Sequence, residues 1–469
     1  MNTPTELYID GKWTPAKSGG TFEVEDPATG QVLVSVADGG VADAEDAIRA
    51  AASAQPEWGR TAPRARSEIL RRAYEMILER TEELASLMTA EMGKPLVEAR
   101  GEVAYGAEFF RWFAEEAVRI GGDHTTTGDG SNRIVVTKEP VGPCVLVTPW
   151  NFPLAMGTRK IGPAVAAGCT MVFKPAEQTP LTALALGQIL DEAGLPPGVL
   201  NIVTTTDPGA VVGHWLAGGI ARKLSFTGST EVGKLLLAQA ATNVMRTSME
   251  LGGNAPFIVC ADADVDRAVA GAMVAKLRNM GEACTAANRF YVHHTIAAEF
   301  ARKLADAMAA ATLGPLIDDA GRSKVQRLVT DAVSRGAQAI TGGVTPAGPG
   351  YFYPPTVLVE VDRGSELLRT EIFGPVAAIL TFDDDDAALA AANDTEWGLV
   401  GYLFTQDIDR AMRFSELLEV GMVGLNTGLV SNPAAPFGGV KQSGLGREGG
   451  RVGIDEFLEY KYLAIPRQI

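Results

Sequence analysis

The chain has 469 residues, of which 46% are hydrophobic and 21% are charged, and its net charge at pH 7 is −16. Because a single core stops growing near about 250–300 residues, this length predicts two or three soluble globular domains. The negative charge argues against nucleic acids and anionic membranes as partners.

The first periodic region, residues 41–120, has the pattern of amphipathic helices. Within it, Ile69, Ala73 and Ile77 recur at helical spacing. The pattern stops at the "MGKP" stretch, where Gly93 is followed by a proline two residues later.

Two series of alternating strands and helices follow. Residues 142–235 contain the apolar strands "PCVLVTPWN", "TMVFKP", "VLNIVTT" and "RKLSFTG", and residues 255–425 contain "APFIVC", "RFYVH", "AAILTF" and "GYLFT". Apolar strands that alternate with helices indicate parallel sheets with right-handed crossovers. No linker separates the series, so the sequence predicts an α/β protein with two tightly packed parallel-sheet domains.

Two strand-like segments, "NRIVVTKEP" and "FLEYKYLAIP", stand outside both series. Strands of this kind are often edges that pair with something else. We hypothesise that they build an oligomer interface. An ordinary surface hairpin with a frayed tail fits the periodicity equally well.

The four cysteines are widely spaced and form no CxxC pair, which favours a reducing, cytoplasmic location over a disulfide scaffold or a zinc ribbon. No signal peptide and no transmembrane helix are expected, because the chain lacks the apolar runs that both require. His293 and His294 are adjacent but lack an HExxH pattern, so no metal site is expected.

Two stretches at predicted strand–helix junctions could contact a cofactor. In "SFTGSTEVGK", Gly228 and Ser229 lie where backbone N–H groups of a helix N-terminus hold phosphate, although glycine there is often only a turn residue. In "FKPAEQTP", Lys174 and Glu177 leave the carboxyl end of a strand, where a carboxylate could bind ribose hydroxyls. The plainer interpretation of that pair is a solvated surface contact.

Three further residues carry groups suited to catalysis. Glu250 in "MELGGNAP" lies near the junction of the two series, where partial desolvation would raise its pKa toward that of a useful base. Asn151 in "TPWNFPL" could donate to an oxyanion. Cys284 in "RNMGEACTAANRF" could be a nucleophile if, for example, a helix N-terminus stabilises its thiolate. Taken alone, each has a commoner interpretation: a solvated glutamate, a turn asparagine and a small buried cysteine.

Together, these motifs resemble the aldehyde dehydrogenase superfamily. The matching stretches run in the family order from about residue 5 to 463 and include "TPWNFPL", "FKPAEQTP", "SFTGSTEVG", "MELGGNAP", "EIFGPV" and "PFGGVKQSGLGREGG". The resemblance implies a Rossmann-like cofactor domain, a catalytic domain and a small β oligomerisation arm. We expect the NAD-binding domain in residues 1–122 and 142–250, the catalytic domain in 251–446, and the oligomerisation segments in 123–141 and 447–469.

The resemblance also implies that the protein oxidises an aldehyde to a carboxylic acid through a thiohemiacetal and then a thioester on Cys284. The Asn151 amide and the Cys284 backbone N–H would hold the oxyanion, and Glu250 would activate the hydrolytic water. Lys160 and Glu448 match positions that assist proton movement or site architecture in related enzymes.

A nicotinamide cofactor follows from the same resemblance. Its adenosine and pyrophosphate contacts match Trp150, Lys174, Glu177, Gly228 and Ser229, and its nicotinamide-ribose contacts match Leu251 and Glu371, with Phe373 beside them. A carboxylate such as Glu177 repels a 2′-phosphate, so NAD is expected as the preferred cofactor, with NADP possible.

Within the superfamily, the chain looks most like the succinate-semialdehyde dehydrogenases, in which two arginines and a serine bind the distal carboxylate of the substrate. The matching residues are Arg159, Arg278 and Ser431, and paired arginines suit a short ω-carboxy aldehyde. The alternatives are a broader enzyme that acts on glutarate semialdehyde or neutral aldehydes, and a non-catalytic structural relative. A homodimer or homotetramer is expected.

The chain departs from the family pattern in three places. Glu282 adds a negative charge near a site expected to receive an anion. Ala286 stands where relatives often have a second cysteine, so no local disulfide is expected. A segment of about ten residues that usually precedes Leu313 is missing.

Overall fold

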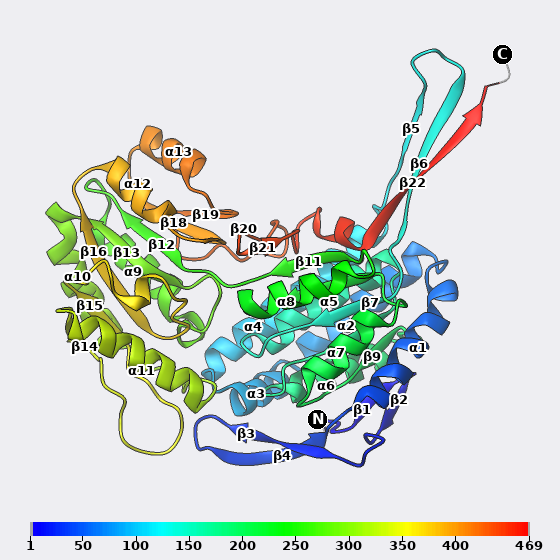
Figure 1. The fold of residues 1–469 in the computed structure, drawn as a ribbon, viewed down its shortest axis with the longest axis horizontal. Coiled ribbons are helices and arrows are strands. Elements are labelled where there is room, and N and C mark those ends of the chain that lie inside the picture. The colour runs from blue at the N-terminus through cyan, green and yellow to red at the C-terminus, as the bar shows by residue number, and fades with distance from the viewer. Residues whose placement is uncertain (1–2, 468–469) are drawn as a thin grey trace.

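The computed structural model describes residues 3–467, which form two α/β lobes and a projecting arm (Figure 1). Each lobe contains one large sheet with a parallel centre, which confirms the predicted α/β fold class. Within the described residues, no helix combines the length and the apolar character needed to cross a membrane.

The first lobe is built on an eight-stranded sheet with the order β2-β1-β9-β8-β7-β10-β11-β21. The strands from β9 to β11 are parallel, whereas β1, β2 and β21 join through antiparallel pairing. The strands are β1 Leu7–Ile9, β2 Lys12–Thr14, β7 Cys144–Val147, β8 Met171–Lys174, β9 Leu200–Ile202, β10 Lys223–Thr227, β11 Arg246–Glu250 and β21 Gly444–Leu445.

Helices cover both faces of this sheet. Successive residues of β7 point to opposite cores, with Val145 in the layer of α1, α7 and α8 and Leu146 in the layer of α5 and α6. The predicted stop at Gly93 is confirmed, because α3 ends there with φ of 88°. The helices are α1 Val41–Trp58, α2 Pro63–Glu79, α3 Thr81–Met92, α4 Leu96–Ala117, α5 Pro153–Ala167, α6 Pro180–Glu192, α7 Pro208–Ala217 and α8 Thr230–Ala241.

The order of the strands creates a topological switch between β7 and β10. From β7 the chain adds β8 and β9 on one side, and then crosses over to add β10 and β11 on the other. In open α/β sheets, ligands bind at the carboxyl ends of the strands beside such a switch. Asn151, Gly228 and Glu250 all lie at this edge of the sheet.

The second lobe contains a seven-stranded sheet with the order β14-β15-β16-β13-β12-β18-β19. Helices α9 and α10 cover one face, and α11, α12 and α13 cover the other. The strands are β12 Ala255–Val259, β13 Ala287–His293, β14 Gln338–Thr341, β15 Thr356–Val359, β16 Val376–Phe382, β18 Val400–Phe404 and β19 Met422–Leu425; the helices are α9 Val265–Leu277, α10 His294–Ala309, α11 Asp319–Ser334, α12 Asp385–Asn393 and α13 Ile408–Leu417.

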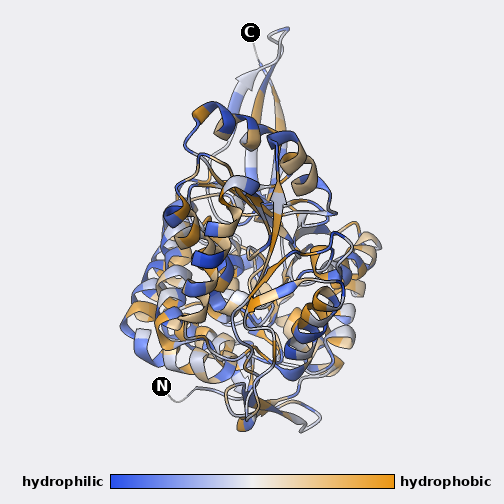
Figure 2. Cartoon of the chain, turned by 90° about the vertical axis from the view of Figure 1, so that its left-hand side faces the viewer, coloured by the Kyte–Doolittle hydropathy of each residue, from blue (hydrophilic) through white to orange (hydrophobic). Residues whose placement is uncertain are grey.

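The arm is a three-stranded antiparallel sheet of β5 (Asp123–Thr126), β6 (Asn132–Pro140) and β22 (Leu458–Pro466). The two strand-like segments that stood outside the series therefore pair with each other, from Leu458 opposite Pro140 to Pro466 opposite Asn132. The arm extends away from both lobes, and its strands include hydrophobic residues (Figure 2).

Short elements complete the fold, and the sequence predicted none of them. They are the hairpin of β3 (Thr21–Asp26) and β4 (Gln31–Ala37), the pair β17 (Trp397–Gly398) and β20 (Val440–Lys441), and the 3-10 helices η1 (Arg278–Gly281), η2 (Glu366–Leu368) and η3 (Gly453–Phe457).

Candidate active site

A cavity of about 240 Å³ lies where the carboxyl edge of the first sheet faces the amino edge of the second. Its walls come from the loops after β7, β10 and β11 and from the segments before β12, β13 and β16. Of the predicted site residues, the structure brings together here Trp150, Asn151, Arg159, Gly228, Ser229, Glu250, Leu251, Arg278, Cys284, Glu371, Phe373 and Ser431. Lys160, Lys174, Glu177 and Glu448 lie outside the lining.

Cys284 lies in a turn just before β13, which the Ala286 N–H closes by donating to the Ala283 carbonyl oxygen at 2.9 Å. A helix N-terminus as the source of thiolate stabilisation is therefore wrong. Burial raises the pKa of Cys284 to about 12, while the positive charge of Arg159 opposes that rise. The turn packs closely against Gly253, where an added Cβ would lie 2.6 Å from the Cys284 carbonyl oxygen.

Asn151 lies between β7 and α5 and turns its amide toward the Cys284 turn. Its Nδ2 donates to the Glu282 carbonyl oxygen at 3.0 Å, which fixes the amide and leaves its second N–H without a partner in the described part of the chain. An amide N–H this close to a cysteine is suited to a negatively charged oxygen on a carbon bound to the sulfur.

A buried polar cluster that the sequence analysis missed supports Asn151 from behind. Lys94 donates to the Asn151 carbonyl oxygen at 2.8 Å and forms an ion pair with Glu102. Glu102 in turn accepts from the backbone N–H groups of Leu154 and Ala155 in the first turn of α5, at 3.0 and 3.1 Å. In the sequence, this lysine and glutamate look like ordinary charges at the start of an amphipathic helix.

Glu250 ends β11, is buried, and has no hydrogen-bond partner for either carboxylate oxygen among residues 3–467. Burial raises the pKa of Glu250 well above its usual value, and the negative charge of Glu448 raises it further. Glu448 itself forms ion pairs with Lys160 at 2.5 Å and Arg159 at 2.8 Å. Burial alone would raise the pKa of Glu448, but these two cations outweigh it and hold that pKa below its usual value. The lowered pKa of Glu448 keeps it charged as an ion-pair partner, whereas the raised pKa of Glu250 suits that carboxyl group better to exchanging a proton.

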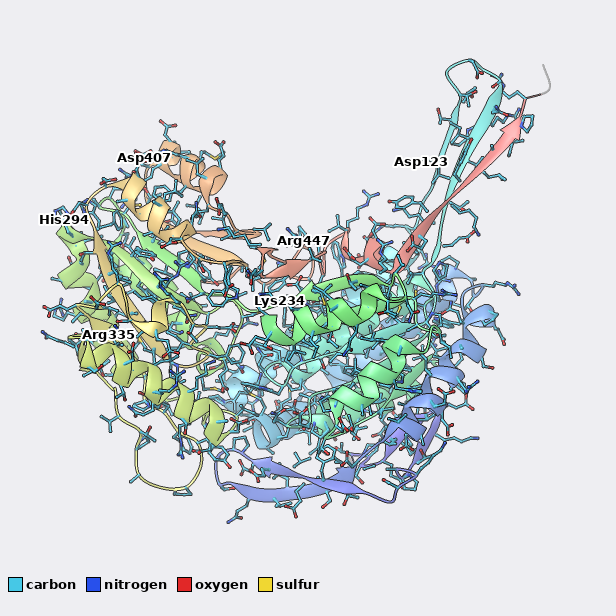
Figure 3. The ribbon with its side chains drawn as sticks, viewed as in Figure 1. Asp123, Lys234, His294, Arg335, Asp407 and Arg447 are labelled. Carbon is cyan, nitrogen blue, oxygen red and sulfur yellow. The ribbon has the colours of Figure 1, made fainter. Side chains whose placement is uncertain are left out.

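The segment that carries Glu448 runs between the two lobes, where Figure 3 labels its neighbour Arg447. The Arg447 guanidinium donates to the carbonyl oxygens of Gly439 and Gly446 at 2.9 and 2.7 Å. Lys234 of α8 donates to Gln442 of the same segment at 2.6 Å. The Lys234 contact holds the segment against the first lobe, and the Arg447 contacts fix the conformation of the segment beside Glu448.

Arg278 reaches the cavity from the turn that follows α9. Its guanidinium lies 4.7 Å from the centroid of the Phe152 ring and 5.6 Å from that of Tyr105, and its Nη1 lies 3.5 Å from Ser431 Oγ. The aromatic contacts were not predicted from the sequence. Tyr105 and Phe109 lie one turn apart on α4, a spacing that in the sequence indicates only a packed helix face.

Arg159 approaches the cavity from α5, on the side of the inter-lobe segment. Its guanidinium stacks 3.9 Å from the centroid of the Phe437 ring, and Glu448 already pairs with its Nε. The structure therefore brings both predicted arginines to one cavity with Cys284. Arg159 forms an ion pair with Glu448, whereas Arg278 forms no ion pair among the described residues.

Glu282 does not place a negative charge in the cavity, which corrects the expectation from the sequence. Its Oε1 accepts from the Ile317 backbone N–H at 3.1 Å, away from Cys284. Burial raises the pKa of Glu282 well above its usual value, so the uncharged acid is favoured.

The predicted cofactor residues extend from the cavity along the carboxyl edge of the first sheet. Ser229 caps α8 by accepting from the Val232 N–H at 3.3 Å. Glu371 accepts from the Gly253 N–H at 3.2 Å, and burial raises the pKa of Glu371 to about 7.

Of the other predicted cofactor residues, two are aromatic and two form an ion pair. Phe373 packs edge-on against Trp150, with ring centroids 5.3 Å apart. Glu177 follows β8 and forms an ion pair with Lys174 at 2.8 Å, with 40% of the glutamate side chain exposed.

Comparisons with known proteins agree with this geometry. The profile of a family described as "Aldehyde dehydrogenase family" matches residues 13–463. A relative from Paenarthrobacter nicotinovorans named succinate-semialdehyde dehydrogenase is 56% identical over 444 residues, which cover 92% of this chain and 99% of the relative. A glutarate-semialdehyde dehydrogenase from Pseudomonas putida is 49% identical, over 98% of this chain and 97% of that protein. A crystal structure of an Escherichia coli NADP dependent enzyme superposes with a TM-score of 0.98 at 46% identity, covering 99% of this chain and 98% of that one.

Proposed function

The chain belongs to the aldehyde dehydrogenase family, and we propose that its substrate is succinate semialdehyde, which it oxidises to succinate. The observation that carries this proposal is the convergence of Arg278, Ser431 and Cys284 in one small cavity. A guanidinium recognises a carboxylate through paired hydrogen bonds, so the cavity favours an aldehyde whose far end is negatively charged. The 56% identity to a succinate-semialdehyde dehydrogenase supports the same substrate.

In the proposed reaction, the Cys284 thiolate attacks the aldehyde carbon. The Asn151 amide and the Cys284 backbone N–H stabilise the resulting oxyanion. A nicotinamide cofactor, when bound, would supply the acceptor for the hydride that leaves that carbon. Glu250 then takes a proton from the water that hydrolyses the thioester on Cys284. Lys160 assists by holding Glu448 in its charged form beside Glu250.

The residues at the carboxyl edge of the first sheet fit a dinucleotide. Thr227 Oγ1 is buried without a partner in the described residues, and Gly228 follows it directly at the start of α8. The N–H groups of a first helical turn favour a pyrophosphate. Leu251 packs against α8 at Gly233, where an added Cβ would lie 2.4 Å from the leucine side chain.

The proposed preference for NAD over NADP rests on Glu177. Its carboxylate is partly exposed at the carboxyl end of β8, where it would accept from a ribose hydroxyl and repel a 2′-phosphate. The similar Escherichia coli structure is of an NADP dependent enzyme, and the kinetic comparison below uses both cofactors.

We also propose which segments of the chain bind the cofactor, carry out catalysis and mediate assembly. Cofactor binding is assigned to 1–122 and 142–250, catalysis to 251–446, and assembly into a homodimer or homotetramer to 123–141 and 447–469. The pairing of β21 with β11 adds a short strand from the catalytic part to the cofactor sheet. The four free cysteines support a reducing, cytoplasmic location.

A kinetic panel tests the proposal. Succinate semialdehyde, glutarate semialdehyde and butanal are each measured with NAD and with NADP. We expect kcat/KM to be highest for succinate semialdehyde with NAD. In Arg278→Leu, the ratio of kcat/KM for succinate semialdehyde to kcat/KM for butanal should fall roughly a hundredfold, because hydrogen bonds to a charged group are lost. Arg278 is the better residue to substitute, because a change at Arg159 would also break its ion pair with Glu448. The control Arg302→Leu removes an exposed arginine of α10 and should change nothing.

Other results of the panel would select among the alternatives. Higher kcat/KM for glutarate semialdehyde would favour the activity named for the Pseudomonas putida relative. A preference for butanal would contradict the carboxylate site, and higher kcat/KM with NADP would contradict the role of Glu177.

A further inference from the structure

Tyr105 brings a polar group into the cavity that the reaction above does not use. The side chain extends from α4 and lines the same cavity as Cys284 and the two arginines. It is partly exposed, and its hydroxyl has no hydrogen-bond partner among residues 3–467. A phenol in such a place retains both its donor and its acceptor capacity for a ligand.

The Tyr105 side chain lies near two cations, Arg278 and Arg159. The ring centroid lies 5.6 Å from the Arg278 guanidinium. The pKa of Arg159 is raised although burial alone would lower it, and Tyr105 is first among the groups that raise it, so Tyr105 and Arg159 lie within electrostatic range. The Phe109 ring packs edge-on against Tyr105 at 5.1 Å and restricts the ring orientation.

We infer that Tyr105 is a specificity-determining residue whose hydroxyl donates a hydrogen bond to the distal carboxylate of the substrate. This inference rests on the proposed function, because it requires a substrate with a carboxylate at the end remote from Cys284. A carboxylate accepts several hydrogen bonds at once, and Arg159 already shares its charge with Glu448. The phenol adds a donor without adding another charge that would have to be balanced.

The variant Tyr105→Phe tests this assignment because it removes the hydroxyl and keeps the ring under Arg278. We expect KM for succinate semialdehyde to rise roughly ten- to hundredfold, as for the loss of a hydrogen bond to a charged group, with little change in kcat. The inhibition constant of succinate should rise by a similar factor, which measures carboxylate binding without turnover. For butanal, which has the same chain length and no carboxylate, kcat/KM should stay within about threefold.

A matched control is available in Tyr74→Phe. Tyr74 also carries a hydroxyl beside an arginine, since its ring lies 5.8 Å from the Arg111 guanidinium, but it lies outside the cavity. This variant should leave all the kinetic constants unchanged. Intact NAD binding by both variants, followed by fluorescence, shows that the fold is retained.

The outcomes separate the inference from the proposed function. If the parent enzyme prefers succinate semialdehyde and Tyr105→Phe keeps that preference and the succinate inhibition, only the inference is overturned. Equal losses for both aldehydes also overturn it, because they assign Tyr105 to packing. If the parent enzyme itself prefers butanal, the proposed substrate class is wrong and the inference falls with it.

Discussion

At the scale of single residues, the surroundings of Cys284, which is half-buried, and of Glu250, which is buried, favour the protonated form of each group. Burial raises the pKa of Cys284 to about 12 and that of Glu250 well above its usual value. Both groups must lose a proton to act, one as a nucleophile and the other as a base. We therefore expect kcat/KM to keep rising with pH through the alkaline range, without a plateau below the pH at which the enzyme unfolds, measured under saturating cofactor.

The same pair of residues predicts a trapped intermediate. In Glu250→Ala, attack by Cys284 and hydride loss would proceed, but hydrolysis would lack its base. Stopped-flow absorbance should show one burst of reduced cofactor per site, and intact-protein mass spectrometry should detect an acyl adduct on Cys284. The control Glu299→Ala removes an exposed carboxylate of α10 and should turn over normally. Steady turnover by Glu250→Ala at the parent rate would assign the base to another group.

At the scale of elements, the junction of α4 and α5 depends on one buried ion pair. Lys94 and Glu102 are each 1% exposed, and Glu102 also accepts the first N–H groups of α5. Removing one member of such a pair leaves a buried charge without its partner.

We expect Glu102→Ala to lower the free energy of unfolding by about 3–5 kcal/mol, measured by chemical denaturation. Glu102→Gln keeps an acceptor for the α5 N–H groups and should lose less. Glu115→Ala on the same helix is exposed and should stay within about 0.5 kcal/mol. Equal stability of all three variants would show that the ion pair does not hold the junction.

The elements also show which features the sequence can and cannot predict. Strands and helices with long apolar patterns, such as α5 and β12, were recognised because their periodicity is local. Strands of two residues have no such signal, and β21 exists only because Gly444 meets Glu250 across the sheet. In the site, the motifs located Cys284 and Glu250, whereas Tyr105 required the fold, since only tertiary packing brings α4 beside Arg278.

At the scale of the whole molecule, the cavity is shared between two lobes and the inter-lobe segment. The first sheet contributes its carboxyl edge, where a dinucleotide would bind, and the second contributes the Cys284 turn at its amino edge. Since neither lobe contains all the reacting groups, the relative position of the lobes sets the distance between cofactor and nucleophile. The contact of Lys234 with the inter-lobe segment and the pairing of β21 with β11 help to fix that position.

The arm exposes several large hydrophobic side chains. On β22, Tyr462 and Leu463 are 59% and 54% exposed, and Ile465 is 38% exposed. Exposed strands with apolar residues are sites where another chain pairs. The double variant Leu463→Asp with Ile465→Asp should therefore shift the protein to a smaller species in size-exclusion chromatography with light scattering. Val344→Asp, which replaces an equally apolar residue that is 73% exposed away from the arm, should keep the parent mass. An unchanged mass for the double variant would show that the arm does not mediate assembly.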